Sequence, residues 1–165
     1  MEVRIDEVTY TKEDTQKLGI QNGDIVTIDP KVQITESGFI KSRFLDDKIS
    51  VSALMGILHH LKENAITPAY DLIFMMSTYE EVGHGMAHIP DEIAELLAVD
   101  MGCIGLDLAC TEQDVSICAK DSSGPYDYDL TSKLIELAKR ETVSYAIDIY
   151  PQYGSDVSAA RNAGN

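Results

Sequence analysis

Carboxylates stand at the ends of several apolar runs in this chain. The sets are Asp46-Asp47, Glu80-Glu81 and Asp100. Charged groups are costly at the rim of an apolar core, and a bound divalent cation is a common partner for them there. In an open α/β sheet the carboxyl ends of the parallel strands meet at one edge, so carboxylates placed there converge. The pattern therefore predicts a metal-dependent hydrolase.

The pair Glu80-Glu81 suits the cleavage of peptides by a metal-activated water. Metal ions lower the pKa of such a water to about 7, and a nearby free Glu takes its proton. At a strand end adjacent side chains diverge, so one Glu can bind metal while the other faces the water. The same divergence argues against a glycosidase, whose two carboxylates face each other across about 5–9 Å.

Composition narrows the class of protein and its partners. The 165 residues carry a formal net charge of −15. Nucleic acids and anionic membranes attract clustered Lys and Arg, so we expect neither as a partner. The chain shows no apolar run of about 18 residues and opens without the apolar core of a signal peptide. The cysteines, Cys103, Cys110 and Cys118, match no zinc or redox spacing, so we expect free thiols in the cytoplasm.

Hydrophobic periodicity predicts an α/β fold with a mixed sheet flanked by helices, because strands alternate with helices in the second part of the chain. Helices are expected at residues 11–18, 49–61, from 90 onward, 130–140 and 156–163. Strands are expected at residues 3–8, 24–28, 72–77, 97–100, 115–119 and 145–150, with a hairpin within 32–40.

The order and spacing of several motifs resemble the glutamyl aminopeptidase group of co-catalytic metallopeptidases, which includes the tetrahedral aminopeptidases. The resemblance covers essentially the whole chain. Its anchors are Phe44-Leu45-Asp46-Asp47-Lys48, Tyr79-Glu80-Glu81-Val82-Gly83, Ala98-Val99-Asp100-Met101-Gly102, Ala119-Lys120-Asp121-Ser122-Ser123-Gly124-Pro125-Tyr126 and Tyr153-Gly154-Ser155-Asp156. The fourth anchor is, within that group, typical of the glutamyl aminopeptidases.

The resemblance implies a di-metal centre that holds two ions of Zn²⁺ or Co²⁺. Asp46 would bridge the two ions, and the Asp46–Asp47 peptide bond would be cis. Glu81 and Asp100 would each bind one ion, and Glu80 would be the general base.

The resemblance also implies the surroundings of that centre. Asp47, Ser155 and Asp156 would shape the substrate side without binding metal. Residues 43–165 would be part of a catalytic domain of the zinc-exopeptidase, phosphorylase/hydrolase-like fold. Residues 1–42 would be the C-terminal part of an inserted dimerisation domain, the tail of a small β-barrel. We expect a cytoplasmic aminopeptidase that releases N-terminal Glu or Asp from peptides and forms homo-oligomers, since family dimers assemble into dodecamers.

Two histidine ligands of the family have no counterpart here. All four histidines, His59, His60, His84 and His88, lie elsewhere in the sequence. We therefore expect this chain to be a fragment without both ends, with poor metal affinity and little activity. Adding the missing histidine segments should restore both the metal affinity and the activity.

Other interpretations stay open. Asp46-Asp47 could instead cap the following helix, Glu80-Glu81 could be a solvated loop, and His84 could be a ligand. The whole chain could be a non-catalytic assembly subunit or a degenerate homologue, or a two-metal hydrolase of another amide or of glycans. A preference for Glu requires local positive charge, for which Lys120 and Arg43 are the candidates.

Overall fold

The computed structural model describes residues 3–164, which divide into two compact units. The first unit is Met1–Arg43 and the second is Phe44–Asn165. This division falls one residue after the predicted domain boundary at residues 42 and 43. The origin of the first unit as part of a dimerisation domain stays a prediction, and each unit is described by itself below.

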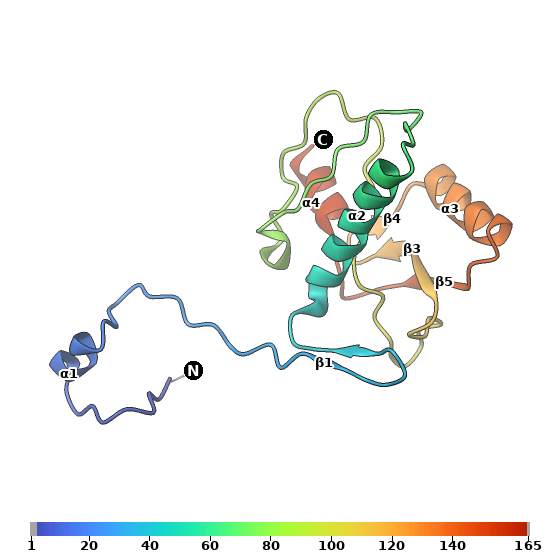
Figure 1. The fold of residues 1–165 in the computed structure, drawn as a ribbon. Coiled ribbons are helices and arrows are strands. Elements are labelled where there is room, and N and C mark those ends of the chain that lie inside the picture. Colours follow the sequence, from blue (N-terminus) through green and yellow to red (C-terminus); the bar gives the residue numbers. More distant parts are fainter. Residues whose placement is uncertain (1–2, 165) are drawn as a thin grey trace. The chain divides into compact units, whose positions relative to one another are not determined.

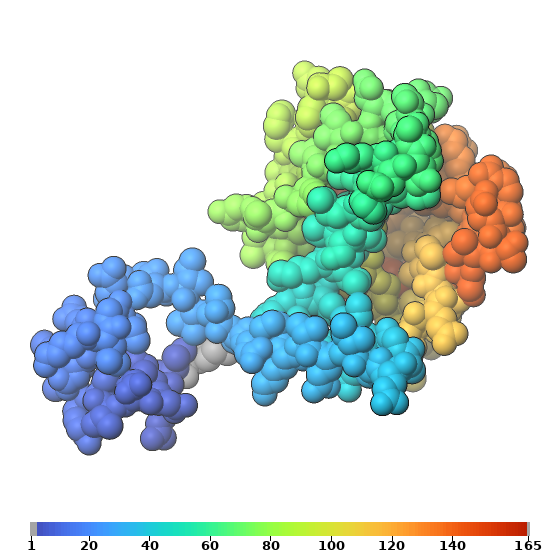
Figure 2. All heavy atoms as spheres, viewed as in Figure 1, coloured from blue at the N-terminus to red at the C-terminus, as the bar shows by residue number. Residues whose placement is uncertain are grey.

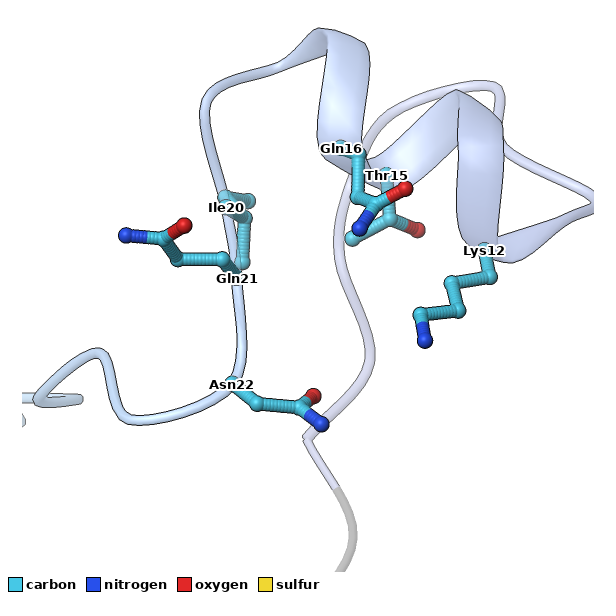
Figure 3. Close-up of a pocket in the computed structure, with 6 residues that line it drawn as sticks. All are labelled: Lys12, Thr15, Gln16, Ile20, Gln21 and Asn22. Carbon is cyan, nitrogen blue, oxygen red and sulfur yellow. The ribbon is translucent and has the colours of Figure 1, made fainter.

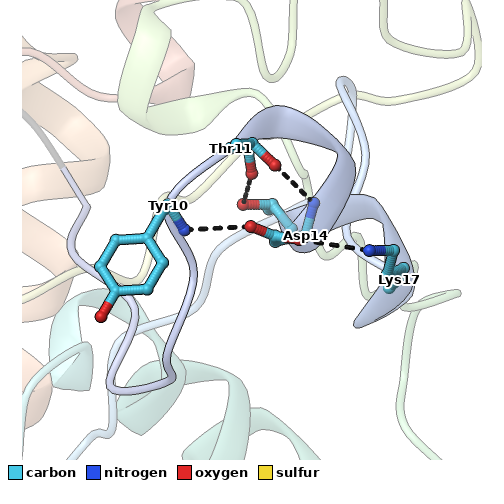
Figure 4. Close-up of polar contacts among 5 residues, drawn as sticks. Tyr10, Thr11, Asp14 and Lys17 are labelled. Carbon is cyan, nitrogen blue, oxygen red and sulfur yellow. Dashed lines mark hydrogen bonds and ion pairs between the residues drawn. The ribbon is translucent and has the colours of Figure 1, made fainter.

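The first unit begins with the short helix α1, Lys12–Lys17. The hydroxyl of Thr11 accepts a hydrogen bond from the backbone N–H of Asp14, so Thr11 is the N-cap of this helix (Figure 4). Asp14 in turn accepts a bond from the backbone N–H of Tyr10 and pairs with Lys17 at 3.3 Å. Gly19 follows the helix with a φ of 85°, the left-handed conformation that glycine adopts most readily. The helix predicted at residues 11–18 is confirmed.

The first unit ends in a β-hairpin. Strand β1, Gln33–Ile34, pairs antiparallel with β2, Ile40–Lys41, across a turn that contains Gly38. This hairpin confirms the prediction for residues 32–40. The strands predicted at residues 3–8 and 24–28 are wrong: Val8 is 81% and Ile25 is 89% exposed, and neither segment finds a strand to pair with. The described residues of this unit form no closed barrel.

The second unit contains a three-stranded mixed sheet in the order β4-β3-β5. The central strand β3, Val115–Asp121, runs parallel to β5, Tyr145–Ile149, and antiparallel to β4, Gly124–Pro125. The apolar and β-branched residues of β3 and β5 explain why these two runs were predicted correctly. The predicted α/β class with a mixed sheet is confirmed.

Helices flank this sheet (Figure 1). Helix α2 spans Leu45–Glu63, α3 spans Tyr128–Arg140 and α4 spans Asp156–Ala163. Asp127 caps α3 through the backbone N–H of Leu130, and Gly164 ends α4 with a φ of 92°. All three helices were predicted, because their start and stop signals are local in the sequence.

The core of the second unit lies between the sheet and its helices. The buried apolar residues are Met86, Cys110, Ile117, Ala138, Tyr150 and Ala160. Two buried carboxylates accompany them. Asp148 on β5 accepts hydrogen bonds from the backbone N–H groups of Ala109 and Cys110, so it fixes a loop to the sheet. Asp121 ends β3 and is 1% exposed. Cys103, Cys110 and Cys118 are free, as predicted.

Three predicted elements of the second unit are wrong. Residues 72–77 and 97–100 form no strands, because they make no ladder hydrogen bonds with the sheet. Residues 90–93 form a turn closed by a bond from Ile93 N–H to the Pro90 carbonyl, instead of starting a helix. The apolar side chains of 72–77 are partly exposed: Leu72 is 54% and Ile73 51% exposed, on a segment that Figure 2 draws in green on the surface of this unit.

Among the residues that the structure describes, no helix has the length and apolar character needed to cross a membrane.

Candidate functional site

Two surface hollows are candidates for a site, one in each unit. The hollow of the first unit has a volume of about 430 Å³ and is drawn in Figure 3. Its lining residues are Lys12, Thr15, Gln16, Ile20, Gln21 and Asn22. These side chains include no carboxylate, imidazole or thiol, so this hollow offers no general base and no set of metal ligands.

The hollow of the second unit measures about 400 Å³ and gathers the predicted carboxylates. We call it the acidic hollow, because Asp46, Glu80, Glu81 and Asp100 all line it. The neutral residues that line it include Met101, Ser122, Ser123, Gln152, Tyr153, Gly154, Ser155, Ser158 and Asn162. Its volume is slightly smaller than that of the first hollow, but its carboxylates can act in acid–base chemistry.

Glu80 and Glu81 reach the acidic hollow from a single turn of 3₁₀-helix, Glu80–Val82, and not from a strand end. The sequence reasoning was therefore wrong about the backbone that carries them. Gly83 closes this turn in the left-handed conformation, with a φ of 75°, so a short tight turn presents both carboxylates to one space.

Asp46 and Asp47 lie where the backbone of α2 departs from helical angles. The peptide bond between them is cis, as the resemblance implied. Asp46 lines the acidic hollow, whereas Oδ1 of Asp47 accepts a 3.3 Å hydrogen bond from the backbone N–H of Ser50. Both interpretations of this pair thus find support: one Asp faces the hollow and the other caps the regular part of the helix.

Burial and mutual repulsion both raise the pKa values of carboxylates in the acidic hollow. Burial, together with the charges of Asp100, Asp156, Glu81 and Asp46, raises the pKa of Glu80 from 4.5 to about 7. Burial and Asp100 raise the pKa of Asp46, and the charge of Asp46 is the main cause that raises the pKa of Glu81. Among the described residues no Lys, Arg or His lines this hollow. A bound cation would relieve the repulsion.

The donor chemistry of the acidic hollow fits a divalent metal, although its geometry is incomplete. Carboxylate oxygens from three separate segments line one space, and such oxygens bind Zn²⁺ and other divalent ions. In the part of the chain that the structure describes, however, no group of three or more His, Cys, Asp or Glu side chains converges closely enough to hold a metal ion.

The two oxygens of Asp100 are held from different sides. Oδ1 accepts a 2.8 Å hydrogen bond from the backbone N–H of Met101. Oδ2 accepts a 2.5 Å bond from the hydroxyl of Tyr153. Tyr153 belongs to an anchor of the resemblance, but sequence reasoning assigned it no role.

One wall of the acidic hollow rests on a buried polar network around Asp121. This carboxylate accepts bonds from the backbone N–H and hydroxyl of Ser123, from Tyr126 and from Ser158. Tyr126 also bonds to Ser155 at 2.7 Å. Sequence reasoning missed Asp121, although the signal was present: it is another carboxylate at the end of an apolar strand.

Asp156 is the first residue of α4 and follows Ser155, which lines the acidic hollow. Its Oδ1 atom is buried and, among the described residues, has no hydrogen-bond partner, and the same holds for Oγ of Ser77. Both atoms face Gly85: a Cβ atom there would lie 2.0 Å from the first and 2.2 Å from the second. The charge of Asp156 is one of the causes that raise the pKa of Glu80.

Three side chains named as candidates are not among the residues that line the acidic hollow. His84 and Lys120 are exposed and do not line it. Arg43 belongs to the first unit, where its guanidinium donates to the Asp29 carbonyl. The described lining therefore contains no cation that would favour an acidic side chain of a substrate.

Comparison with known proteins gives two findings. The family described as M42 glutamyl aminopeptidase matches residues 1–165. The Bacillus subtilis (strain 168) protein named "Putative aminopeptidase YhfE" is 50% identical over 166 residues, which cover 100% of this chain and 48% of that relative. The chain thus spans about half the length of the curated relative that it matches.

Proposed function

This chain belongs to the M42 glutamyl aminopeptidase family, and on that premise we propose that its acidic hollow is part of the active site of a metal-dependent aminopeptidase. The observation that carries the proposal is the meeting of Asp46, Glu80, Glu81 and Asp100 in one hollow, although they come from three segments far apart in the sequence. Like charges are not gathered without a cation or a proton to stabilise them.

Glu80 is the general base in this proposal. Its pKa of about 7 lies close to neutral pH, where a base works most effectively in proton transfer. Glu80 would take a proton from the attacking water as the water oxygen bonds to the peptide carbonyl carbon. The same carboxyl would then deliver that proton to the leaving nitrogen as the C–N bond breaks.

Asp46, Glu81 and Asp100 are the residues that would hold the metal, proposed to be two ions of Zn²⁺ or Co²⁺. When bound, such ions lower the pKa of water and polarise the scissile carbonyl. Asp47, Ser155 and Asp156 would shape the substrate side. The positions of these three support that role indirectly: Asp47 caps α2 beside Asp46, Ser155 lines the hollow, and Asp156 begins α4 behind it.

The substrates would be peptides with a free N-terminus, and the proposed preference is for N-terminal Glu or Asp. The family description supports this preference. Since no cation belongs to the described lining, the positive charge that selects an acidic side chain would have to come from outside it. The proposal further includes a cytoplasmic location, which suits a net charge of −15 because self-repulsion keeps a protein in solution. It also includes a homo-oligomer, which rests on the resemblance alone.

The test is hydrolysis of Glu-p-nitroanilide and Leu-p-nitroanilide by the purified chain, with Zn²⁺ or Co²⁺ added. Because two histidine ligands of the family have no counterpart among these residues, we expect little turnover from this chain; what turnover there is should be faster on the Glu substrate and should disappear in Glu80→Gln. The exposed Glu92→Gln is the matched control and should keep the activity. Turnover that survives in Glu80→Gln would refute the role of this residue. If no turnover is seen with any amino-acid anilide, the next step is to restore the two missing histidine segments: turnover regained then supports the aminopeptidase, and turnover still absent favours a non-catalytic assembly role.

A further inference from the structure

Tyr153 is fixed at its backbone and at its ring. Its carbonyl oxygen accepts two hydrogen bonds from Ser122, one from the backbone N–H at 2.9 Å and one from the hydroxyl at 2.7 Å. Its ring packs against that of Tyr150, with a centroid distance of 5.3 Å and an interplanar angle of 58°. The phenol therefore has little freedom to turn away from its partner.

Asp100, in contrast, lies on a segment without helix or strand hydrogen bonds. In the part of the chain that the structure describes, the hydrogen bonds to its carboxylate come from the adjacent backbone N–H of Met101 and from the hydroxyl of Tyr153. The first of these is local and moves with the segment. Of these two, the bond from Tyr153, 53 positions along the chain, connects the carboxylate to the sheet side of the acidic hollow.

We propose that Tyr153 is the positioning residue that orients the Asp100 carboxylate toward the acidic hollow, and this inference rests on the proposed function. An ionised carboxylate offers about four lone-pair sites, so two hydrogen bonds leave others for a cation. A phenol that donates to one oxygen fixes the plane of the carboxylate and so presents the remaining lone pairs in one direction. Partners of this kind typically change metal affinity by about 10–100-fold when they are removed.

The matched pair of variants is Tyr153→Phe and Tyr150→Phe. Each deletes one phenol oxygen at the carboxyl end of β5, but the Tyr150 hydroxyl bonds to Ser116 at 2.7 Å and does not line the acidic hollow. The probe is Co²⁺, titrated into the 165-residue chain by calorimetry and followed by its visible absorption. Because a chain with an incomplete ligand set should bind weakly, the titration extends to millimolar metal.

We expect Tyr153→Phe to weaken Co²⁺ binding about 10-fold and to change the visible spectrum, while Tyr150→Phe lowers thermal stability but leaves the affinity unchanged. A double-mutant cycle separates positioning from general damage. In an Asp100→Asn background, Tyr153→Phe should have no additional effect on affinity.

Three results would overturn the inference, and they can be told apart. Unchanged affinity in Tyr153→Phe would remove the role of Tyr153 and leave the proposed function intact. An equal loss in the Asp100→Asn background would show that Tyr153 acts through the fold and not through Asp100. A wild-type chain that binds no Co²⁺ at millimolar concentration would overturn the metal chemistry of the proposed function, and this inference with it.

Discussion

The hydroxyl of Tyr126 donates a 2.8 Å hydrogen bond to Oδ2 of Asp121, an almost fully buried carboxylate. The phenol oxygen can then accept a bond from the hydroxyl of Ser155, 2.7 Å away. The hydroxyl of Ser158 also donates to Asp121. One carboxylate at the end of β3 thus holds the start of α4, and with it one wall of the acidic hollow.

Replacing Asp121 by Asn should destabilise the second unit. The amide keeps the shape of the side chain but has only one acceptor oxygen. Its NH₂ group stands in for the other oxygen and cannot accept there, so either the bonds from Ser123 or those from Tyr126 and Ser158 are lost. Hydrogen bonds to charged groups contribute about 1.5–3 kcal/mol each, so we expect a loss of about 2–3 kcal/mol. Urea unfolding followed by circular dichroism measures it. Asp91→Asn, at an exposed position, is the control, and an equal effect of the two variants would contradict a structural role for the network.

Asp121 should also make the stability of the chain depend on acidic pH. Burial raises its pKa, but the bonds from Ser123, Ser158 and Tyr126 outweigh burial and hold the pKa below 3.8. A carboxylate with a lowered folded-state pKa contributes stability that is present above the unfolded pKa and is lost as the pH falls through the folded one. The difference in unfolding free energy between wild type and Asp121→Asn should therefore stay constant near neutral pH. It should shrink as the pH falls below 3.8, the ordinary pKa of an Asp carboxyl group. A difference that stays the same at acidic pH would show that the charge of Asp121 contributes nothing.

Glu80 should show the opposite dependence in the metal-free chain. Folding raises the pKa of Glu80 from 4.5 to about 7. The contribution of the protonated carboxyl group to stability is therefore fully present below pH 4.5 and is lost as the pH rises through about 7. Glu80→Gln mimics the protonated form. Its melting temperature should exceed that of wild type at about pH 8 and match it at acidic pH, as differential scanning fluorimetry in EDTA would measure. Equal melting temperatures for the two proteins at about pH 8 would mean that Glu80 is not under electrostatic strain.

The elements that sequence could predict are those with local signals. Thr11, Asp127 and Gly164 mark helix ends through bonds and backbone angles within a few residues, and the helices follow. A strand exists only with a partner, so apolar runs such as 72–77 and 97–100 were indistinguishable in sequence from β3. Strand pairing depends on the tertiary fold, so the sequence of one run alone does not predict it.

The same distinction applies to the site. The carboxylates were found because charges at the ends of apolar runs are conspicuous in a sequence, and the structure brings four of them to one hollow. The roles of Asp121 and Tyr153 depend on bonds to residues far along the chain, which spacing does not predict. The place of Asp121 at the end of an apolar strand marks it as a candidate, but not the bond that it accepts from Ser158. Asp47 shows a third case, in which adjacent identical residues divide between the hollow and a helix cap.

Gly85 gives a final prediction, because its missing side chain makes room behind the acidic hollow. A Cβ atom there would lie 2.0 Å from Oδ1 of Asp156 and 2.2 Å from Oγ of Ser77, far inside contact distance. Gly85→Ala must therefore displace Asp156 or the turn that carries Glu80, and overpacking of this kind costs about 1–3 kcal/mol. Gly56→Ala is the matched control: nothing lies within 4 Å of its Cβ, and within α2 it should stabilise by about 0.5–1 kcal/mol. Urea unfolding of both variants should give shifts of opposite sign, and a neutral Gly85→Ala would mean that this close approach does not exist in solution.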